Sequence, residues 1–143
     1  MAVSDLGGRP ATRTPVQWAA LVFGIGFLLA TAAGFVATGL TNMDPNPDTA
    51  PRALGIFPVN VLHNLVHLVF GVWGVLASRT FGGAKAYCTT TGVIYLVLAA
   101  LGYIAPTGFG LVPLGGTDPI LHIVLGVPLL AFGLTARPRQ TVG

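Results

Sequence analysis

Residues 55–72 read GIFPVNVLHNLVHLVFGV, and residues 110–127 repeat this pattern without a gap as GLVPLGGTDPILHIVLGV. The alignment pairs His67 with His122 and places a glycine one helical turn after each histidine. Each copy runs directly into an apolar segment long enough to span a membrane. Because a polar side chain inside lipid is costly, the two histidines mark positions that do more than fill hydrophobic space.

The composition is that of a membrane protein. Apolar residues make up 53% of the 143 residues and charged residues only 8%, so the chain lacks the charged surface of a soluble domain. Seven Lys and Arg residues stand against four acidic ones, but they are scattered over tails and loops and form no basic patch. We therefore expect the lipid bilayer as a partner and no nucleic-acid partner.

Apolar runs and helix-end signals predict an all-α integral membrane fold, a bundle of four transmembrane helices. Thr14, Pro15 and Gln17 have the spacing of a helix start, in which Thr14 caps the helix and Gln17 completes a capping box. Asp118 before Pro119 gives a similar signal for the last helix, with Asp118 as the N-cap. The predicted units are a flexible cytoplasmic tail over 1–13, a four-span domain over 14–136 with spans at about 17–39, 59–78, 86–105 and 118–136, and a second cytoplasmic tail over 137–143.

Two connecting segments are expected to be irregular. Residues 41–58 contain four prolines, which argue against regular structure. Residues 82–85 read GGAK and predict a short basic turn before the third span. Both segments are therefore assigned to loops.

Basic residues are distributed unequally between the two ends of the predicted helices. Only Arg52 falls on the side of the long loop, whereas the side of the termini carries Arg9, Arg13, Arg79, Lys85, Arg137 and Arg139. Since basic residues favour the cytoplasmic side, we expect a multi-pass protein of the cell (plasma) membrane with both termini in the cytoplasm. Each repeat unit then holds two spans that enter in the same direction, which predicts two parallel two-helix repeats with the second and fourth spans adjacent and His67 opposite His122.

Strongly polar side chains form one stripe on the second span and a matching stripe on the fourth. Positions i, i+3, i+4 and i+7 share one face of a helix. The predicted intramembrane cluster consists of Asn60, His63, Asn64, His67, Asp118 and His122. Because Asp118 occupies the place of His63 in the repeat, an acid and a base are expected to lie close together.

Four interpretations of this cluster stay open. It can be a network of interhelical hydrogen bonds that needs no cofactor, since polar side chains commonly join membrane helices. It can hold haem b between His67 and His122, because axial histidines on facing helices suit haem. It can bind a divalent metal ion through His63, His67, Asp118 and His122, because histidines at i and i+4 present two nitrogens on one face. A proton or solute relay is the fourth interpretation.

Small residues predict where helices approach each other closely. The expected helix-packing positions are Gly26, Ala30 and Gly34 on the first span, with Gly71, Gly74 and Gly126 on the second and fourth. The single cysteine, Cys88, is expected to be a buried thiol, and Tyr95 lies within reach of the polar stripe in the third span. The chain shows no nucleophile with a base and no pair of acids, so no catalytic residues are assigned.

Three segments carry a family resemblance: GIFPVNVLHNLVH at 55–67, YLVLA at 95–99 and DPILHIVLG at 118–126. They resemble a family of small four-span bacterial membrane proteins catalogued only as a domain of unknown function, over roughly residues 16–136. The resemblance implies the fold and the membrane location, and it implies no activity. We expect a non-enzymatic structural or accessory subunit of a larger membrane assembly, with other membrane subunits as partners and haem b or divalent-metal binding as the alternative.

Overall fold

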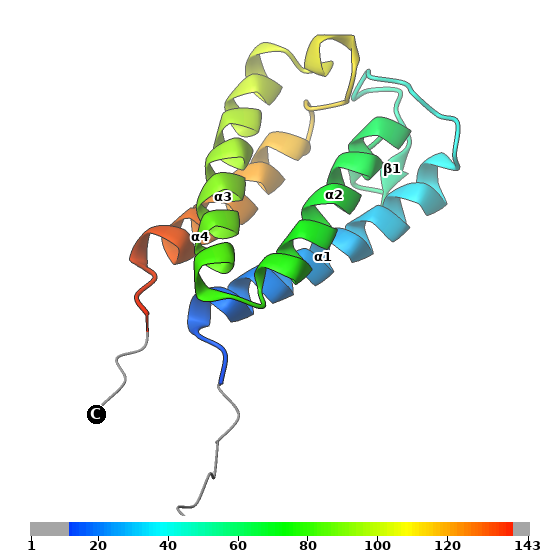
Figure 1. Ribbon diagram of the computed structural model, residues 1–143. Coiled ribbons are helices and arrows are strands. Elements are labelled where there is room, and N and C mark those ends of the chain that lie inside the picture. Colours follow the sequence, from blue (N-terminus) through cyan, green and yellow to red (C-terminus); the bar gives the residue numbers. More distant parts are fainter. Residues whose placement is uncertain (1–11, 139–143) are drawn as a thin grey trace, which may run out of the picture.

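The computed structural model describes residues 12–138, which form a bundle of four helices (Figure 1). The elements are α1 (Pro15–Thr38), β1 (Arg52–Ala53), β2 (Phe57–Pro58), α2 (Val61–Ala77), α3 (Phe81–Ile104), a 3₁₀ turn (Gly108–Gly110) and α4 (Asp118–Thr135). Within the predicted tails, residues 1–11 and 139–143, with Arg9 and Arg139, lie outside the described residues.

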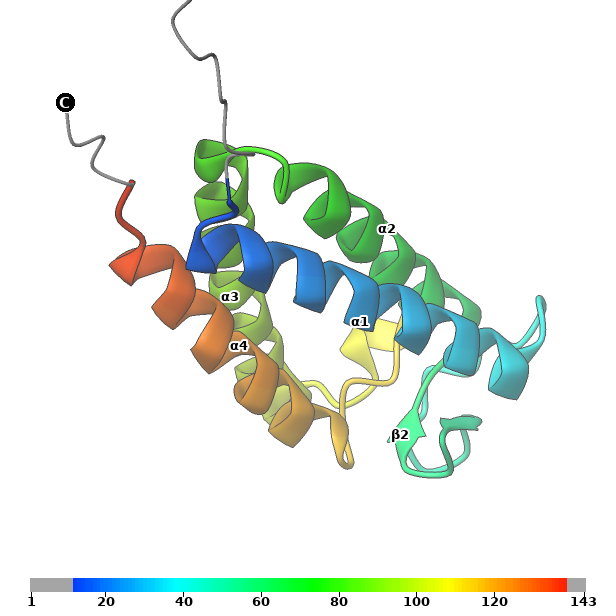
Figure 2. The same cartoon turned by 90° about the horizontal axis from the view of Figure 1, so that it is seen from below.

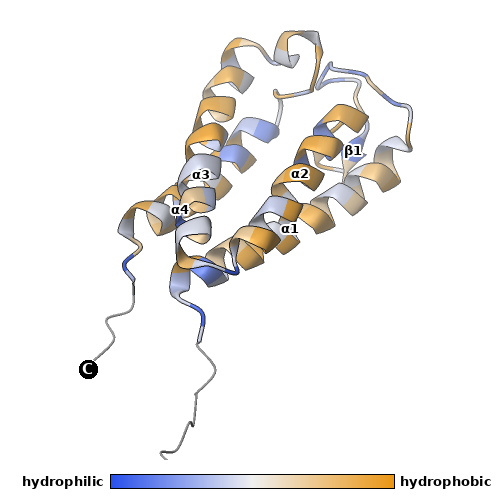
Figure 3. Ribbon diagram, in the orientation of Figure 1, coloured by the Kyte–Doolittle hydropathy of each residue, from blue (hydrophilic) through white to orange (hydrophobic). Residues whose placement is uncertain are grey.

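The helices suit a lipid environment. α1, α3 and α4 are long and apolar enough to cross a membrane, and hydrophobic residues run along all four helices (Figure 3). α2 is a shorter apolar helix of 17 residues, about 25 Å long at the usual rise of an α-helix. The all-α membrane bundle predicted from the sequence is confirmed. The start of α1 and the end of α4 lie at one end of this bundle, and the β1–β2 hairpin lies at the other (Figures 1 and 2).

A capping contact fixes the start of α1, whereas α4 begins without a side-chain cap. Oε1 of Gln17 accepts a hydrogen bond from the backbone N–H of Thr14 at 3.0 Å, and Nε2 of Gln17 donates to the carbonyl of Ser78 at the end of α2. The expected N-cap role of Asp118 is wrong, because Asp118 is the first residue of α4 and Thr117 precedes it. Its carboxylate turns instead toward His122, one turn further along the helix.

The third helix begins five residues before the predicted start at 86, so the expected turn over 82–85 is wrong. Thr80 is the N-cap, and its Oγ1 accepts a hydrogen bond from the backbone N–H of Gly83 at 3.1 Å. A Cβ atom at Gly83 would lie only 3.0 Å from the carbonyl oxygen of Ala77. A glycine is therefore needed here to let α3 start directly after α2, which explains why the glycine pair belongs to a helix.

The expectation that residues 41–58 are irregular is wrong in part, because a short β-hairpin forms within them. β1 and β2 pair antiparallel, with Arg52 opposite Pro58, and the turn between them includes Leu54 and Gly55 at φ values of 53° and 73°. The proline lies at the end of its strand, where a missing N–H is tolerated. Earlier in the loop, hydrogen bonds from the Thr49 hydroxyl and the backbone N–H of Asn46 hold the pKa of Asp44 below its ordinary value. The loop is thus an ordered cover over the end of the bundle.

The helices pack as two hairpins, α1 with α2 and α3 with α4, and α1 also contacts α3. The expected adjacency of α2 and α4 is wrong, because their backbones make little or no contact within the described bundle. The cause lies in the small residues: Gly71 and Gly74 of α2 lie against Leu28 and Gly24 of α1, while Gly126 of α4 lies against Tyr95 of α3. Gly74 also lies against the ring of Tyr87, so the glycines of α2 pack against both α1 and α3.

The small-residue stripe expected on α1 is wrong at one position. A Cβ atom added at Gly26 would meet nothing within 4 Å, whereas one added at Gly24 would lie 2.7 Å from the backbone nitrogen of Val75. Gly34 does face a neighbour, since it lies against the side chain of Asn64. The buried face of α1 is therefore set by Gly24 and Gly34 and turns away from Gly26.

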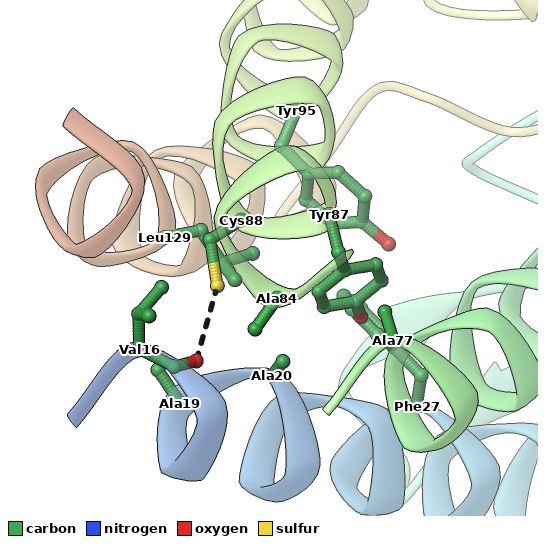
Figure 4. Packing of buried hydrophobic residues seen from close by; sticks show 10 residues of the cluster. All are labelled: Val16, Ala19, Ala20, Phe27, Ala77, Ala84, Tyr87, Cys88, Tyr95 and Leu129. Atoms are coloured by element: carbon green, nitrogen blue, oxygen red, sulfur yellow. Dashed lines mark hydrogen bonds between the residues drawn. The ribbon is translucent and has the colours of Figure 1, made fainter. Parts of the chain in front are cut away.

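The hydrophobic core gathers at the end of the bundle near the termini (Figure 4). Tyr87, Cys88 and Leu129 are fully buried there, and the ring of Tyr87 packs against Trp73 and Gly74 of α2. The Cys88 thiol donates a weak hydrogen bond of 3.9 Å to the carbonyl of Val16. Apolar packing thus holds one end of the bundle, and the polar residues occupy the half that lies under the hairpin.

Candidate functional site

The six predicted cluster residues are all buried in the half of the bundle under the hairpin. Their exposed fractions are Asn60 0%, His63 4%, Asn64 0%, His67 9%, Asp118 2% and His122 2%. The first four come from the start of α2 and the last two from the start of α4. The spacing of the stripes explains this placement, because each set shares one helix face.

The two asparagines act as structural connectors. Oδ1 of Asn60 caps α2 by accepting a hydrogen bond from the backbone N–H of His63 at 2.8 Å, and its Nδ2 donates to the carbonyl of Leu111 at 2.8 Å. Nδ2 of Asn64 donates to Oγ1 of Thr38 at 2.9 Å, which ties α2 to the end of α1. The Asn64–Thr38 contact matches the interhelical hydrogen bonds that join membrane helices, whereas Asn60 ties the start of α2 to the loop before α4.

Asp118 and His122 form an acid–base pair on α4. They lie at i and i+4, so their side chains meet on one face, and Oδ2 of Asp118 is 3.1 Å from Nδ1 of His122. Neither atom makes a well-aligned hydrogen bond to any other group in the part of the chain that the structure describes. The i, i+4 spacing therefore brings a carboxylate and an imidazole together in a buried position.

His63 approaches this pair from the other hairpin. Its ring stacks on the ring of His122 with a centroid distance of 6.3 Å and an interplanar angle of 19°. One nitrogen or carboxylate oxygen from each of His63, Asp118 and His122 lies within 4.8 Å of the other two. Side chains from two helices whose backbones barely meet thus converge on one point.

His67 lies beside this group. Its ring is 4.5 Å from the ring of His63 and stacks on Phe27 of α1 at 5.8 Å. The α2 histidine whose ring stacks on His122 is His63, so the expected opposition of His67 and His122 is wrong. The repeat aligned two histidines, but the ring stacked on His122 belongs to His63, one turn before His67 on α2.

Tyr95 of α3 closes the group from a third helix. Its ring meets that of His122 edge-on, with a centroid distance of 4.7 Å and an interplanar angle of 74°. It also contacts Phe27, with 5.2 Å between ring centroids. Aromatic contacts of this kind orient an imidazole without using its nitrogens for hydrogen bonds.

Three buried polar atoms of the cluster have no hydrogen-bond partner among the described residues: Nδ1 of His63, Nδ1 of His67 and Oδ1 of Asn64. Nδ1 of His122 and Oδ2 of Asp118 have only each other, at 3.1 Å. An unsatisfied buried polar atom costs about 1–3 kcal/mol. Asn64 still makes a hydrogen bond through its Nδ2, whereas the histidines are held mainly by ring contacts. The hydrogen-bond network expected from the sequence is therefore carried by Asn60 and Asn64 and not by the three histidines.

Two cavities adjoin the cluster. The larger has a volume of about 380 Å³ and is lined by α1, the hairpin and α4, with His67, Tyr95, Asp118 and His122 in its wall. The smaller, about 90 Å³, is lined by His63 and again by His67, Tyr95 and His122. The histidines thus stand between two spaces inside the bundle.

A family model described as a domain of unknown function (DUF4383) matches residues 17–135. The chain belongs to this family. No curated protein and no solved structure matches the chain. The matched DUF4383 segment contains every residue of the cluster and all four helices except the first two residues of α1.

Sequence reasoning missed the α1 side of this DUF4383 site. Phe27 stacks on His67, and Thr38 accepts the hydrogen bond from Asn64. Thr31, between them, donates to the carbonyl of Phe27 within α1 and is also buried. The sequence did contain a signal, because Phe27, Thr31 and Thr38 share the helix face of Gly24. The four-residue spacing of Gly26, Ala30 and Gly34 instead predicted packing on a different face.

Proposed function

We propose that this protein binds a divalent transition-metal ion inside the membrane, through His63, Asp118 and His122. One observation carries the proposal: ligand atoms from these three buried residues, on two separate helices, lie within 4.8 Å of one another. Around a tetrahedral zinc ion with bonds of about 2.0–2.1 Å, ligand atoms stand about 3.3 Å apart. Small side-chain rotations would bring the three atoms to that spacing.

The chemistry of the donor set supports a borderline ion such as Zn²⁺ or Fe²⁺. Two imidazoles and one carboxylate are the protein ligands of many catalytic zinc sites and of non-haem iron sites, and both kinds leave at least one coordination position open. Coordination would also give partners to buried nitrogens that the protein leaves without hydrogen bonds. His67 stands outside the group and is not one of the proposed ligands.

The geometry gives haem b less support than a metal ion. The ring of His63 contacts both His67 and His122. A porphyrin held between His67 and His122 would have to displace this ring and separate Tyr95 from His122. The larger cavity lies beside the histidines and is lined by side chains of α1 and α4.

The test is metal content after purification in a mild detergent without chelator. Wild-type protein should hold about one zinc or iron ion per chain by elemental analysis, and His63→Ala and His122→Ala should lose it. His67→Ala is the matched control and should keep the ion, since His67 is outside the three-residue group. Loss of the ion in all three variants would indicate four ligands, and a Soret band in the wild type would favour haem. A wild type with neither ion nor haem would contradict the proposal.

We also propose the orientation and setting that the sequence predicts: a plasma-membrane protein with cytoplasmic termini, built from two related helix hairpins. One end of the bundle carries four basic residues: Arg13 before α1, Arg79 after α2, Lys85 in the first turns of α3 and Arg137 after α4. Arg52 is in the hairpin at the other end. This distribution supports the orientation. The role of an accessory subunit with other membrane proteins stays a prediction, and the metal site would then be that subunit's contribution to the assembly.

A further inference from the structure

The larger cavity has a mainly apolar wall and one polar region. Most of its wall is apolar, and includes Val22, Leu121 and Leu125. The polar part of the wall is concentrated at the cluster, where Asp118 and His122 of the proposed metal site line the same space. A volume of about 380 Å³ lies in the range of small-molecule sites.

Part of the cavity wall lies on the exposed apolar surface of α1. Val22 lies near the middle of α1, is 61% exposed and lines the cavity. Gly26, one turn further along, is also part of the lining, and a Cβ atom there would meet nothing within 4 Å. Figure 2 shows α1 and α4 close together near the start of α1 and further apart toward the hairpin. Both helices contribute to the lining and both are long and apolar enough to cross a membrane, so we expect lipid chains beside this wall.

The net charge of the proposed metal site indicates which chemical group the polar end of a ligand would carry. A divalent ion bound by one carboxylate and two neutral imidazoles leaves one net positive charge in a buried site. An uncompensated charge in such surroundings is strongly unfavourable. A ligand with an anionic oxygen group at the open coordination position would neutralise it, and carboxylate oxygens are good ligands for zinc and iron.

We propose that this cavity binds a single long-chain carboxylic acid, which enters from the bilayer between α1 and α4. The alkyl chain would lie along the apolar wall past Gly26, and the carboxylate would reach the metal ion between Asp118 and His122. His67 and Tyr95, in the same wall, would flank the head group. This inference rests on the proposed metal site.

The test uses a diazirine-bearing palmitic acid as a photocrosslinking probe on the metal-loaded protein in lipid nanodiscs. Crosslinks should map to the cavity-lining parts of α1 and α4. Gly26→Phe should fill the cavity and reduce labelling by at least about tenfold, a change of about 1.4 kcal/mol or more. Gly82→Phe is the matched control, because Gly82 is another helical glycine with open space around its Cβ position and it is not part of the cavity lining.

Competition in the wild type keeps the test independent of how the variants fold. Unlabelled palmitic acid should displace the probe, and hexadecane, which lacks a head group, should not. Equal competition by both, or full labelling of a folded Gly26→Phe protein, would overturn the inference. Wild-type protein that holds the metal ion but is not labelled at the cavity overturns the fatty-acid site alone. Absence of the ion overturns the proposed function and, with it, the assignment of the head group.

Discussion

The α1–α2 contact makes a quantitative prediction about two glycines on one helix. Gly24→Ala would place a methyl group 2.7 Å from the backbone nitrogen of Val75, 2.9 Å from the carbonyl carbon of Gly74 and 3.0 Å from the carbonyl oxygen of Gly71. These are backbone atoms and cannot rotate away, so α1 and α2 must separate. Overpacking of this kind costs about 1–3 kcal/mol. Gly26→Ala is the control, because its methyl group would meet nothing within 4 Å.

The Gly26→Ala control also cancels the effect of helix propensity on the free energy of unfolding. Replacing glycine by alanine in a helix is favourable by up to about 1 kcal/mol, and both variants gain this alike. The difference between the two free energies of unfolding therefore reports packing alone, and we expect Gly24→Ala to be less stable than Gly26→Ala by about 1–3 kcal/mol. Unfolding in mixed detergent micelles, followed by circular dichroism, measures it. Equal stabilities, or a less stable Gly26→Ala protein, would refute the packing described here and favour the stripe expected from the sequence.

Two further predictions concern topology and the asparagine contacts. In a cysteine-free background, an impermeant thiol reagent applied to intact cells should label a cysteine at Asn46 but not cysteines at Ser4 or Thr141, and the reverse pattern would invert the orientation. Asn64→Leu removes the hydrogen bond to Thr38 and should lower stability by about 1 kcal/mol without loss of the metal ion, whereas metal loss in this variant would argue against the division between connectors and ligands.

Helices and burial followed from the sequence because they depend on local pattern. The apolar runs fixed four helices, and Thr14 with Gln17 marked the start of α1. The spacing of Asn60, His63 and His67 placed them on one face of α2, which the structure buries. Burial of a polar stripe follows from the cost of exposing it to lipid.

Contacts between helices did not follow in the same way, because they depend on angles and depths that no local pattern records. The repeat pairs His67 with His122 in the alignment, yet the α2 ring that stacks on His122 is that of His63. Gly24 and Gly26 lie on nearly opposite faces of α1, and only the close approach of α2 shows that Gly24 is used and Gly26 is not.

The proposed metal ion is held by two histidines and one aspartate inside the membrane. X-ray absorption at the metal K-edge of the purified wild-type protein tests it most directly, since imidazole rings give a characteristic outer-shell scattering pattern. We predict about two imidazoles per ion and only nitrogen and oxygen ligands, with bonds of about 2.0–2.2 Å. A shell of oxygen alone, without imidazole scattering, would identify an adventitious ion and contradict the claim, as would a wild-type protein that carries no metal.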